Sequence, residues 1–253
     1  FRHLGLAIPK RLLLEGDELP YNEYMRLQNV FASSETDNAS SMMRKLRMMK
    51  TPWEIEQMRI SARIHEAVYR EIPSYYRAGM TDIELQIEIE KCMRTHGSLG
   101  YFRAFGANMD IFMGSLLVGD NADVVSPFDF ALGGAGVHPS GPLGASGIRL
   151  RDGTTVMVDM SGNYTAYQTD MTRVFAVGSL PEKAYRVHQV ALDIQAQMML
   201  KAAPGISCAE LYHDALLLVE REGLNDCFMG RSFQAKFIGH GVGLEINELP
   251  VIS

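Results

Sequence analysis

Four helix-start motifs, arranged in two pairs, constrain the fold of this chain more than any other feature of its sequence. Each motif has Ser or Thr followed three positions later by Glu, the capping-box pattern of a helix N-terminus. The motifs begin at Thr51, Thr81, Ser179 and Ser207. The members of a pair are 30 residues apart (51 to 81) and 28 apart (179 to 207). Because the spacing recurs, we expect a duplicated half made of two helices and strands.

Strand-like segments lie between and after the two helix pairs. They cover 155–160, 167–177 and 233–238 and are rich in Val, Phe, Thr and Met. Two helix pairs that cover one face of a curved, mainly antiparallel sheet would bury that face and leave the other to form a cleft. The sequence therefore predicts an α+β fold with duplicated helix-helix-strand halves.

The first 50 residues differ from the remainder. Pro9, Pro20 and the polar stretch 33–41 interrupt any long periodicity. We expect a domain tail and linker over 1–50 and the main domain over 51–253. The chain opens with Phe rather than Met and stops just after a strand-like segment, so we also expect truncation, at the C-terminus in particular.

Composition argues against two classes of partner. The 24 basic and 30 acidic residues give a net charge of -6, with no dense basic run, which excludes nucleic acid as the expected partner. No apolar run approaches the roughly 20 residues that span a bilayer, so no membrane is expected. Three cysteines without a CxxC pair suit a reducing compartment and predict a cytoplasmic protein. We interpret them as buried apolar residues.

Asp159 and Asp170 are the first candidate site residues. A Gly-Asn turn signal lies between them, so a hairpin centred on 164–165 would place the two carboxylates opposite each other. Thr172 shares the strand parity of Asp170 and would point to the same face. The apolar neighbours indicate a buried setting, in which like charges repel. Three interpretations stay open: a dyad sharing a proton, a cation between the carboxylates, or a turn Asp beside an Asp paired with Arg173.

His240 is the third candidate. It stands among three glycines in the segment GHGVG, 239–243, after an apolar pair. Glycine permits the close approach that a crowded site requires, although a histidine in such a turn is also found in purely structural roles. Together with the Asp pair, His240 favours a metal site. Carboxylate oxygens with one imidazole favour Mn(II), Fe(II), Co(II) or Zn(II).

Three ordered blocks resemble the signature of the pita-bread metallopeptidases, the group of creatinase, aminopeptidase P, prolidase and methionine aminopeptidase. The blocks are VDMSG at 158–162, TDMTR at 169–173 and GHGVGLEINELP at 239–250. The resemblance implies the pita-bread fold over 51–253. It also implies that 1–50 is the end of the creatinase-type N-terminal domain that precedes this fold. We expect a homodimer.

The resemblance implies a function and a ligand set. In that family two Asp, one His and two Glu hold two divalent metals, and a hydroxide that bridges the metals attacks a peptide carbonyl near a chain's N-terminus. Asp159, Asp170 and His240 match the first three ligands, and the two Glu are expected after Ser253. The predicted cofactors are two ions of Mn, Co, Fe or Zn. The predicted function is Xaa-Pro aminopeptidase or dipeptidase activity on short peptides.

His138 and Asn247 are the catalytic candidates that the resemblance adds. His138 lies ahead of the first Asp block, where family members carry a proton donor for the leaving amine; a plain loop histidine is the alternative. Asn247 replaces a second family histidine, and an amide can donate a hydrogen bond to a substrate carbonyl but cannot shuttle a proton. Asn247 keeps open a creatinase-like or lyase relative acting on a small non-peptide substrate. An inactive family member is a further alternative, because the two Glu ligands are not in view.

Overall fold

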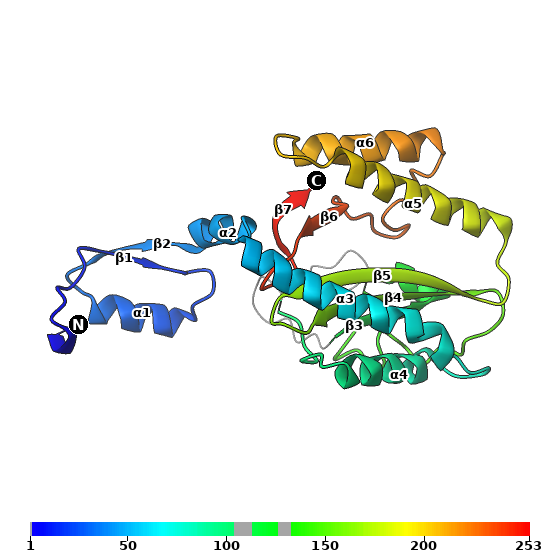
Figure 1. The fold of residues 1–253 in the computed structure, drawn as a ribbon, viewed down its shortest axis with the longest axis horizontal. Helices are drawn as coiled ribbons and strands as arrows, with labels where there is room; N and C mark the ends of the chain where they lie inside the picture. Colours follow the sequence, from blue (N-terminus) through cyan, green and yellow to red (C-terminus); the bar gives the residue numbers. More distant parts are fainter. Residues whose placement is uncertain (1, 104–112, 126–132) are drawn as a thin grey trace.

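The computed structural model describes residues 2–103, 113–125 and 133–253. Figure 1 shows a small N-terminal unit, a sheet covered by one helix pair, and a second helix pair beside the C-terminal strands. In chain order the elements are η1 Arg2–Leu4, β1 Arg11–Leu14, α1 Tyr21–Val30, β2 Glu35–Asn38, α2 Ser40–Met48, α3 Pro52–Tyr75, α4 Asp82–Thr95, β3 Gly114–Val118, η2 Gly119–Asp123, β4 Thr154–Asn163, β5 Gln168–Val177, α5 Glu182–Lys201, α6 Cys208–Arg221, β6 Gly239–Gly241 and β7 Glu248–Ile252.

Three of the four predicted helix starts are confirmed. Thr51 and Thr81 cap α3 and α4 in complete capping boxes, in which the Glu three residues later returns a bond to the cap backbone. Ser207 caps α6 by accepting from the backbone N–H of Glu210. The start at Ser179 is wrong, because α5 begins only at Glu182. A residue before proline is biased away from helical angles, so Leu180, which precedes Pro181, delays that helix.

Strands β3, β4 and β5 form an antiparallel sheet in that order. The β4–β5 hairpin closes at the pair Asn163–Gln168, so its centre lies further along the chain than the predicted 164–165. Asp159 therefore pairs with Thr172, and Asp170 pairs with Ser161. The direct opposition predicted for the two Asp is wrong. Because the register differs by two residues, both Asp still lie on one face, as diagonal neighbours.

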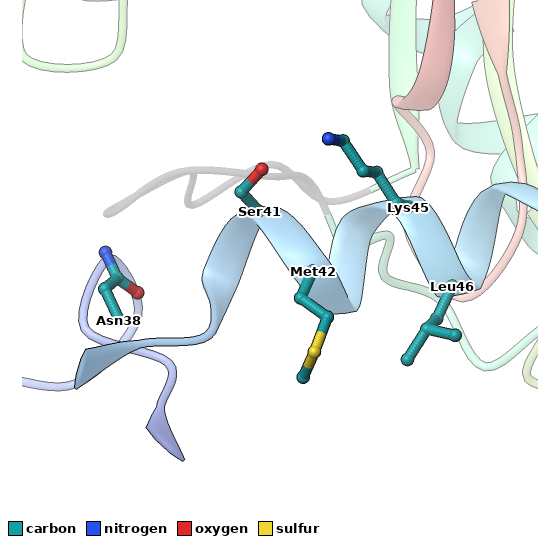
Figure 2. A pocket seen from close by; sticks show the side chains of 5 residues that line it. All are labelled: Asn38, Ser41, Met42, Lys45 and Leu46. Atoms are coloured by element: carbon teal, nitrogen blue, oxygen red, sulfur yellow. The ribbon is translucent and has the colours of Figure 1, made fainter. Parts of the chain in front are cut away.

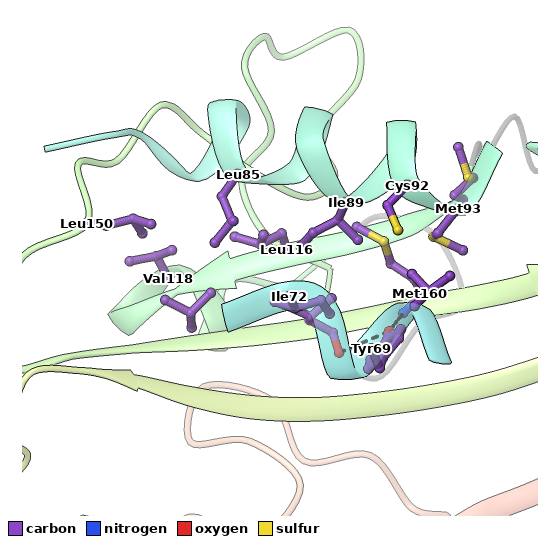
Figure 3. Packing of buried hydrophobic residues seen from close by; sticks show 14 of the residues in the cluster. Tyr69, Ile72, Leu85, Ile89, Cys92, Met93, Leu116, Val118, Leu150 and Met160 are labelled. Atoms are coloured by element: carbon purple, nitrogen blue, oxygen red, sulfur yellow. Dashed lines mark hydrogen bonds between the residues drawn. The ribbon is translucent and has the colours of Figure 1, made fainter. Parts of the chain in front are cut away.

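The main hydrophobic core lies between this sheet and the helices α3 and α4 (Figure 3). Val156, Val158 and Met160 alternate along β4 and face the helices, almost fully buried. Asp159 lies between two of them in sequence and therefore faces the opposite side of the sheet. The core residues labelled in Figure 3 are Tyr69, Ile72, Leu85, Ile89, Cys92, Met93, Leu116, Val118, Leu150 and Met160.

A second core lies between α5 and α6 and contacts the segment before β6 through Ile238. The strand predicted over 233–238 is wrong: pairing begins only at β6, which is antiparallel to β7. In this segment the Ala235 N–H donates to the Met229 carbonyl at 3.2 Å, and the Ile238 N–H donates to the Ile252 carbonyl of β7 at 2.9 Å. Ser232 donates to Asp123 at 2.7 Å, and Gln234 donates to the Phe228 carbonyl at 3.2 Å. Such side-chain bonds compete with a strand ladder.

The N-terminal unit contains structure that the sequence patterns do not indicate. Strands β1 and β2 pair in parallel with α1 between them, and α2 leads into α3 (Figure 1). Each strand has four residues and none of them is buried, although β1 contains three consecutive leucines. The interpretation of the cysteines is correct for Cys92, which is buried, and wrong for Cys227, which is exposed. Across the described residues, no helix combines the length and the apolar character needed to cross a bilayer.

Candidate metal centre

Asp159 and Asp170 lie on the sheet face opposite the main core, and His240 lies close enough to both to affect their pKa values. The Nε2 atom of His240 lies 3.4 Å from Oδ2 of Asp170. The Nδ1 atom of His240 is 3.0 Å from the Gly241 carbonyl, which can only accept, so Nδ1 carries the proton and Nε2 presents its lone pair. Thr172 lies on the same face, as strand parity predicts, and donates from Oγ1 to Asp159 at 2.5 Å.

The two carboxylates give this centre an excess of negative charge, which favours the binding of a cation. Burial and the neighbouring charge of Asp159 raise the pKa of Asp170 to about 6, while His240 opposes the rise. Burial also raises the pKa of Asp159, against the hydrogen bond from Thr172 and the charge of His240. The side chains of Asp170 and His240 remain 35% and 22% exposed. Two carboxylates and an imidazole are hard-to-borderline donors, so they fit a divalent ion that enters from solvent.

A row of polar side chains on α3 holds the hairpin that carries the two Asp. Ser61, His65 and Tyr69 are spaced four residues apart, so they share one face of the helix. The sequence patterns do not single out Ser61 or Tyr69, and they indicate only a packed or solvated helix residue at His65. Ser61 Oγ donates to the Tyr167 carbonyl at 3.0 Å, and His65 Nδ1 lies 2.9 Å from Thr169 Oγ1. Tyr69 Oη donates to the Met171 carbonyl at 2.6 Å and accepts from the Met160 N–H at 3.1 Å.

Glu248 anchors the loop that follows His240 to the helix α2. Its side chain is 4% exposed and binds Arg47 Nη2 at 2.5 Å and Lys50 Nζ at 2.7 Å. It also accepts from two backbone N–H groups of its own loop, at 3.0 and 3.2 Å. A Cβ added at Gly243 would lie 2.3 Å from the carboxylate, so the close approach requires glycine. Burial opposes the charge, but Lys50 and Arg47 bring the pKa of Glu248 below its ordinary value.

This anchor was missed by the sequence patterns. Arg47, in the last turn of α2, and Lys50, just after that helix, are three residues apart. Glu245, in the loop, and Glu248, at the start of β7, are also three apart. Arg47 also contacts Glu245, at 2.9 Å. The matched spacing of opposite charges is the signal that the sequence contains, but about 200 residues separate the two pairs. Only folding shows that they meet.

The two catalytic candidates lie in different surroundings. Asn247 is half-buried, immediately before Glu248 and β7. His138 is exposed, and its Nδ1 atom bonds within its own turn, to Ser140 Oγ at 2.8 Å and to the Ser140 N–H at 3.1 Å. In the part of the chain that the structure describes, no hydrogen bond or ion pair joins His138 to Asp159, Asp170 or His240.

A hollow on the surface lies along α2 rather than at this centre. Figure 2 shows its lining residues, Asn38, Ser41, Met42, Lys45 and Leu46. None of these five is a carboxylate or an imidazole, so the hollow lacks the donor set described above. The chemistry of the candidate centre is therefore independent of the hollow.

The comparison with protein families identifies the chain. The profile of metallopeptidase family M24 matches residues 56–253. This chain belongs to metallopeptidase family M24. The predicted family and its pita-bread α+β fold are confirmed, and M24 is a family of divalent-metal enzymes.

Individual relatives agree with the family assignment. An uncharacterized peptidase of Bacillus subtilis is 28% identical over 96% of this chain and 60% of its own length. A Xaa-Pro dipeptidase of Pyrococcus furiosus is 36% identical over 43% of this chain and 30% of its own. This M24 chain thus spans about 60% of the first of these relatives.

Two solved structures are similar in fold. An X-Pro aminopeptidase from Thermotoga maritima has a TM-score of 0.77 at 24% identity, covering 100% of this chain and 62% of that one. A prolidase from Pyrococcus furiosus has a TM-score of 0.73 at 25% identity, covering 96% of this chain and 63% of that one. The arrangement of helices and strands in this M24 chain is therefore one that peptidases use.

Proposed function

We propose that this chain carries the Asp–Asp–His part of a divalent-metal site that hydrolyses a peptide bond near the N-terminus of short peptides. The proposed activity is of the Xaa-Pro aminopeptidase or dipeptidase type, which is what several similar proteins are named for. The observation that carries the proposal is the meeting of Asp159, Asp170 and His240, with the His240 Nε2 atom 3.4 Å from Asp170. Family membership supports it.

Asp159, Asp170 and His240 would hold the metal, and Thr172 would orient Asp159. Asp159, Asp170 and His240 supply oxygen and nitrogen donors for two ions of Mn, Co, Fe or Zn, with two Glu expected after Ser253. Such an ion lowers the pKa of water and polarises a carbonyl. Thr172 fixes Asp159 through its 2.5 Å hydrogen bond, so that carboxylate keeps one orientation.

His138 and Asn247 would serve the substrate. Because the Ser140 N–H donates to Nδ1 of His138, the neutral ring carries its hydrogen on Nε2. As a general acid for the leaving amine, His138 would act from its imidazolium form, because a neutral imidazole does not give up that proton. Asn247 would donate a hydrogen bond to a substrate carbonyl. We also propose that 1–50 is the end of an N-terminal domain, that 51–253 belongs to the catalytic domain, and that the protein works as a cytoplasmic homodimer.

Asp170→Asn tests the metal site. The amide removes the negative charge but keeps the shape of the side chain. We expect divalent-ion affinity to fall by more than the roughly 10- to 100-fold typical of changes at residues that hydrogen-bond to a metal ligand. We also expect Xaa-Pro hydrolysis to be lost. Calorimetric titration with Mn(II), Co(II) and Zn(II) gives the affinity. Asp193→Asn, an exposed carboxylate on α5, is the matched control. Unchanged affinity in Asp170→Asn would sink the proposal.

Asn247 favours one second candidate function, a creatinase-like or lyase reaction on a small non-peptide substrate. An amide at this position cannot relay a proton near neutral pH. A screen of the metal-loaded protein against Xaa-Pro dipeptides and small amidines separates the two. Turnover of an amidine without dipeptide cleavage would favour the second candidate.

A further inference from the structure

A cluster of three unlike metal-binding side chains lies between α3 and α4, apart from the centre described above. Glu71 projects from α3, and Cys92 and His96 project from α4. One donor atom from each lies within 4.8 Å of the donors of the other two. His96 Nε2 is 3.5 Å from Glu71 Oε1, and Cys92 Sγ is 3.8 Å from Glu71 Oε2. Among the described residues, this is the one group of three His, Cys, Asp or Glu side chains whose donor atoms all lie within 4.8 Å of one another.

The spacing of these donors suits a tetrahedral ion. Zinc bonds thiolate at about 2.3 Å, imidazole at about 2.0–2.1 Å and carboxylate at about 2.0–2.2 Å, which puts neighbouring donors roughly 3.3–3.6 Å apart. The two observed separations from Glu71, 3.5 and 3.8 Å, are close to that range. Cys92 Sγ lies 3.5 Å from His96 Nδ1, so a turn of the imidazole is required for its Nε2 atom to share one ion with the sulfur and Glu71.

The histidine is held in the tautomer that a metal needs. Nδ1 of His96 lies 3.0 Å from the Cys92 carbonyl, which can only accept, so the proton resides on Nδ1. The lone pair is then on Nε2, the atom that faces Glu71. A backbone carbonyl that orients a ligating imidazole in this way is a usual feature of metal sites. Tyr75 supports the carboxylate in the same manner, donating to Glu71 Oε2 at 2.7 Å.

Charge and access also match a divalent ion. A Cys92 thiolate and the Glu71 carboxylate carry two negative charges, and neutral His96 adds none, so a divalent ion gives a neutral site. The thiol proton leaves to solvent when the ion binds. Cys92 is 6% exposed and belongs to the main core, whereas the side chains of His96 and Glu71 are 37% and 45% exposed. An ion can therefore reach the buried sulfur from the surface.

We propose that Glu71, Cys92 and His96 form a second, structural site for a divalent ion of the zinc class, with water in the fourth position. A sulfur donor selects borderline-soft ions, unlike the all-oxygen and nitrogen donors of Asp159, Asp170 and His240. The site joins α3 to α4 on the face of the sheet opposite those residues, so its ion stabilises the helix pair and takes no part in hydrolysis.

Cobalt spectroscopy tests the site, because a sulfur-to-cobalt charge-transfer band in the near ultraviolet reports only a cysteine ligand. The Cys208→Ser/Cys227→Ser variant removes the other two thiols. In that background we expect titration with Co(II) to produce the band, once any binding at Asp159, Asp170 and His240 is saturated, and Zn(II) to remove it. Adding Cys92→Ser should abolish the band, and adding Asp170→Asn should leave it intact. Absence of the band from the double variant, or its survival in Cys92→Ser, would overturn the proposal.

A second measurement covers the risk that a change at the buried Cys92 unfolds the protein. His96→Gln alters a partly exposed side chain and removes one ligand. In an Asp170→Asn background, which disables the other centre, we expect Zn(II) to raise the midpoint of thermal unfolding, and we expect His96→Gln to remove most of that shift. Equal shifts with and without His96 would refute the site and would leave the proposed peptidase function untouched.

Discussion

Thr172 shows how one hydroxyl can orient a carboxylate that we propose as a metal ligand. Its hydroxyl donates to Asp159 at 2.5 Å, and its side chain is not part of the main core. Thr172→Val keeps the β-branched shape but removes the donor, so we expect affinity for Mn(II) or Zn(II) to fall about 10- to 100-fold. Thr172→Ser keeps the donor and should bind nearly as well as the parent. Calorimetric titration of both variants measures the difference, and equal affinities for Val and Ser would argue against an orienting role.

His65 makes the free energy of unfolding depend on pH. Its side chain is fully buried and Nε2 has no hydrogen-bond partner among the described residues. Burial, with a smaller contribution from Arg173, lowers the pKa of His65 from 6.5 to about 4. Between those values the unfolded chain takes up a proton that the folded chain does not, so the folded state loses stability as the pH falls from about 6.5 to about 4.

The size of this effect follows from the shift. We expect His65 to cost about 2 kcal/mol of stability between pH 7 and pH 5. Urea unfolding at a series of pH values measures it. In His65→Gln, which cannot titrate, this component should vanish while a hydrogen bond to Thr169 stays possible. A variant with the same pH slope as the parent would show that another group is responsible.

The anchor between α2 and the loop before β7 joins elements that are far apart in sequence. Lys50→Met removes one of the two cations from Glu248, whose side chain is 4% exposed. We expect a loss of about 1–3 kcal/mol in the free energy of unfolding, less than for a fully isolated buried charge, because Arg47 remains. Arg63→Met, which breaks an exposed pair with Glu56, should cost less than about 1 kcal/mol.

Chemical denaturation of the two variants tests this anchor. Calorimetric metal titration adds a second readout, because the same loop follows His240. If the loop positions His240, Lys50→Met should also weaken divalent-ion binding, whereas Arg63→Met should not. Identical stabilities for Lys50→Met and Arg63→Met would show that the anchor contributes little.

Across the whole molecule, stability depends chiefly on the core beneath α3 and α4. Leu116 is fully buried in that core, whereas Leu217 on α6 is 50% exposed. We expect Leu116→Ala to cost about 2–5 kcal/mol, from lost burial and the cavity left behind. Leu217→Ala should stay within about 0.5 kcal/mol of the parent. Urea unfolding of both variants checks the contrast, which would fail if the two losses were similar.

Several features were predictable because their causes are local. Capping boxes at Thr51 and Thr81 act within one helix turn, so the sequence marks α3 and α4 correctly. Strand alternation places Asp170 and Thr172 on one face, and Asp159 shares that face because the predicted register is in error by two residues rather than one. The signature blocks around these residues also indicate the family.

Other features depend on contacts between distant segments, which no local pattern contains. Bonds from Ser61 and Tyr69 on α3 hold the hairpin in a register that the turn signal alone predicts wrongly. The segment 233–238 has strand-like composition, but Gln234 and Ala235 bond to a loop and Ile238 bonds to β7. The sequence by itself therefore determined three of the four helix starts, the shared face of the two Asp and the family. Tertiary structure alone decided the register and the pairing of Lys50 with Glu248, because packing selects among arrangements that are locally equivalent.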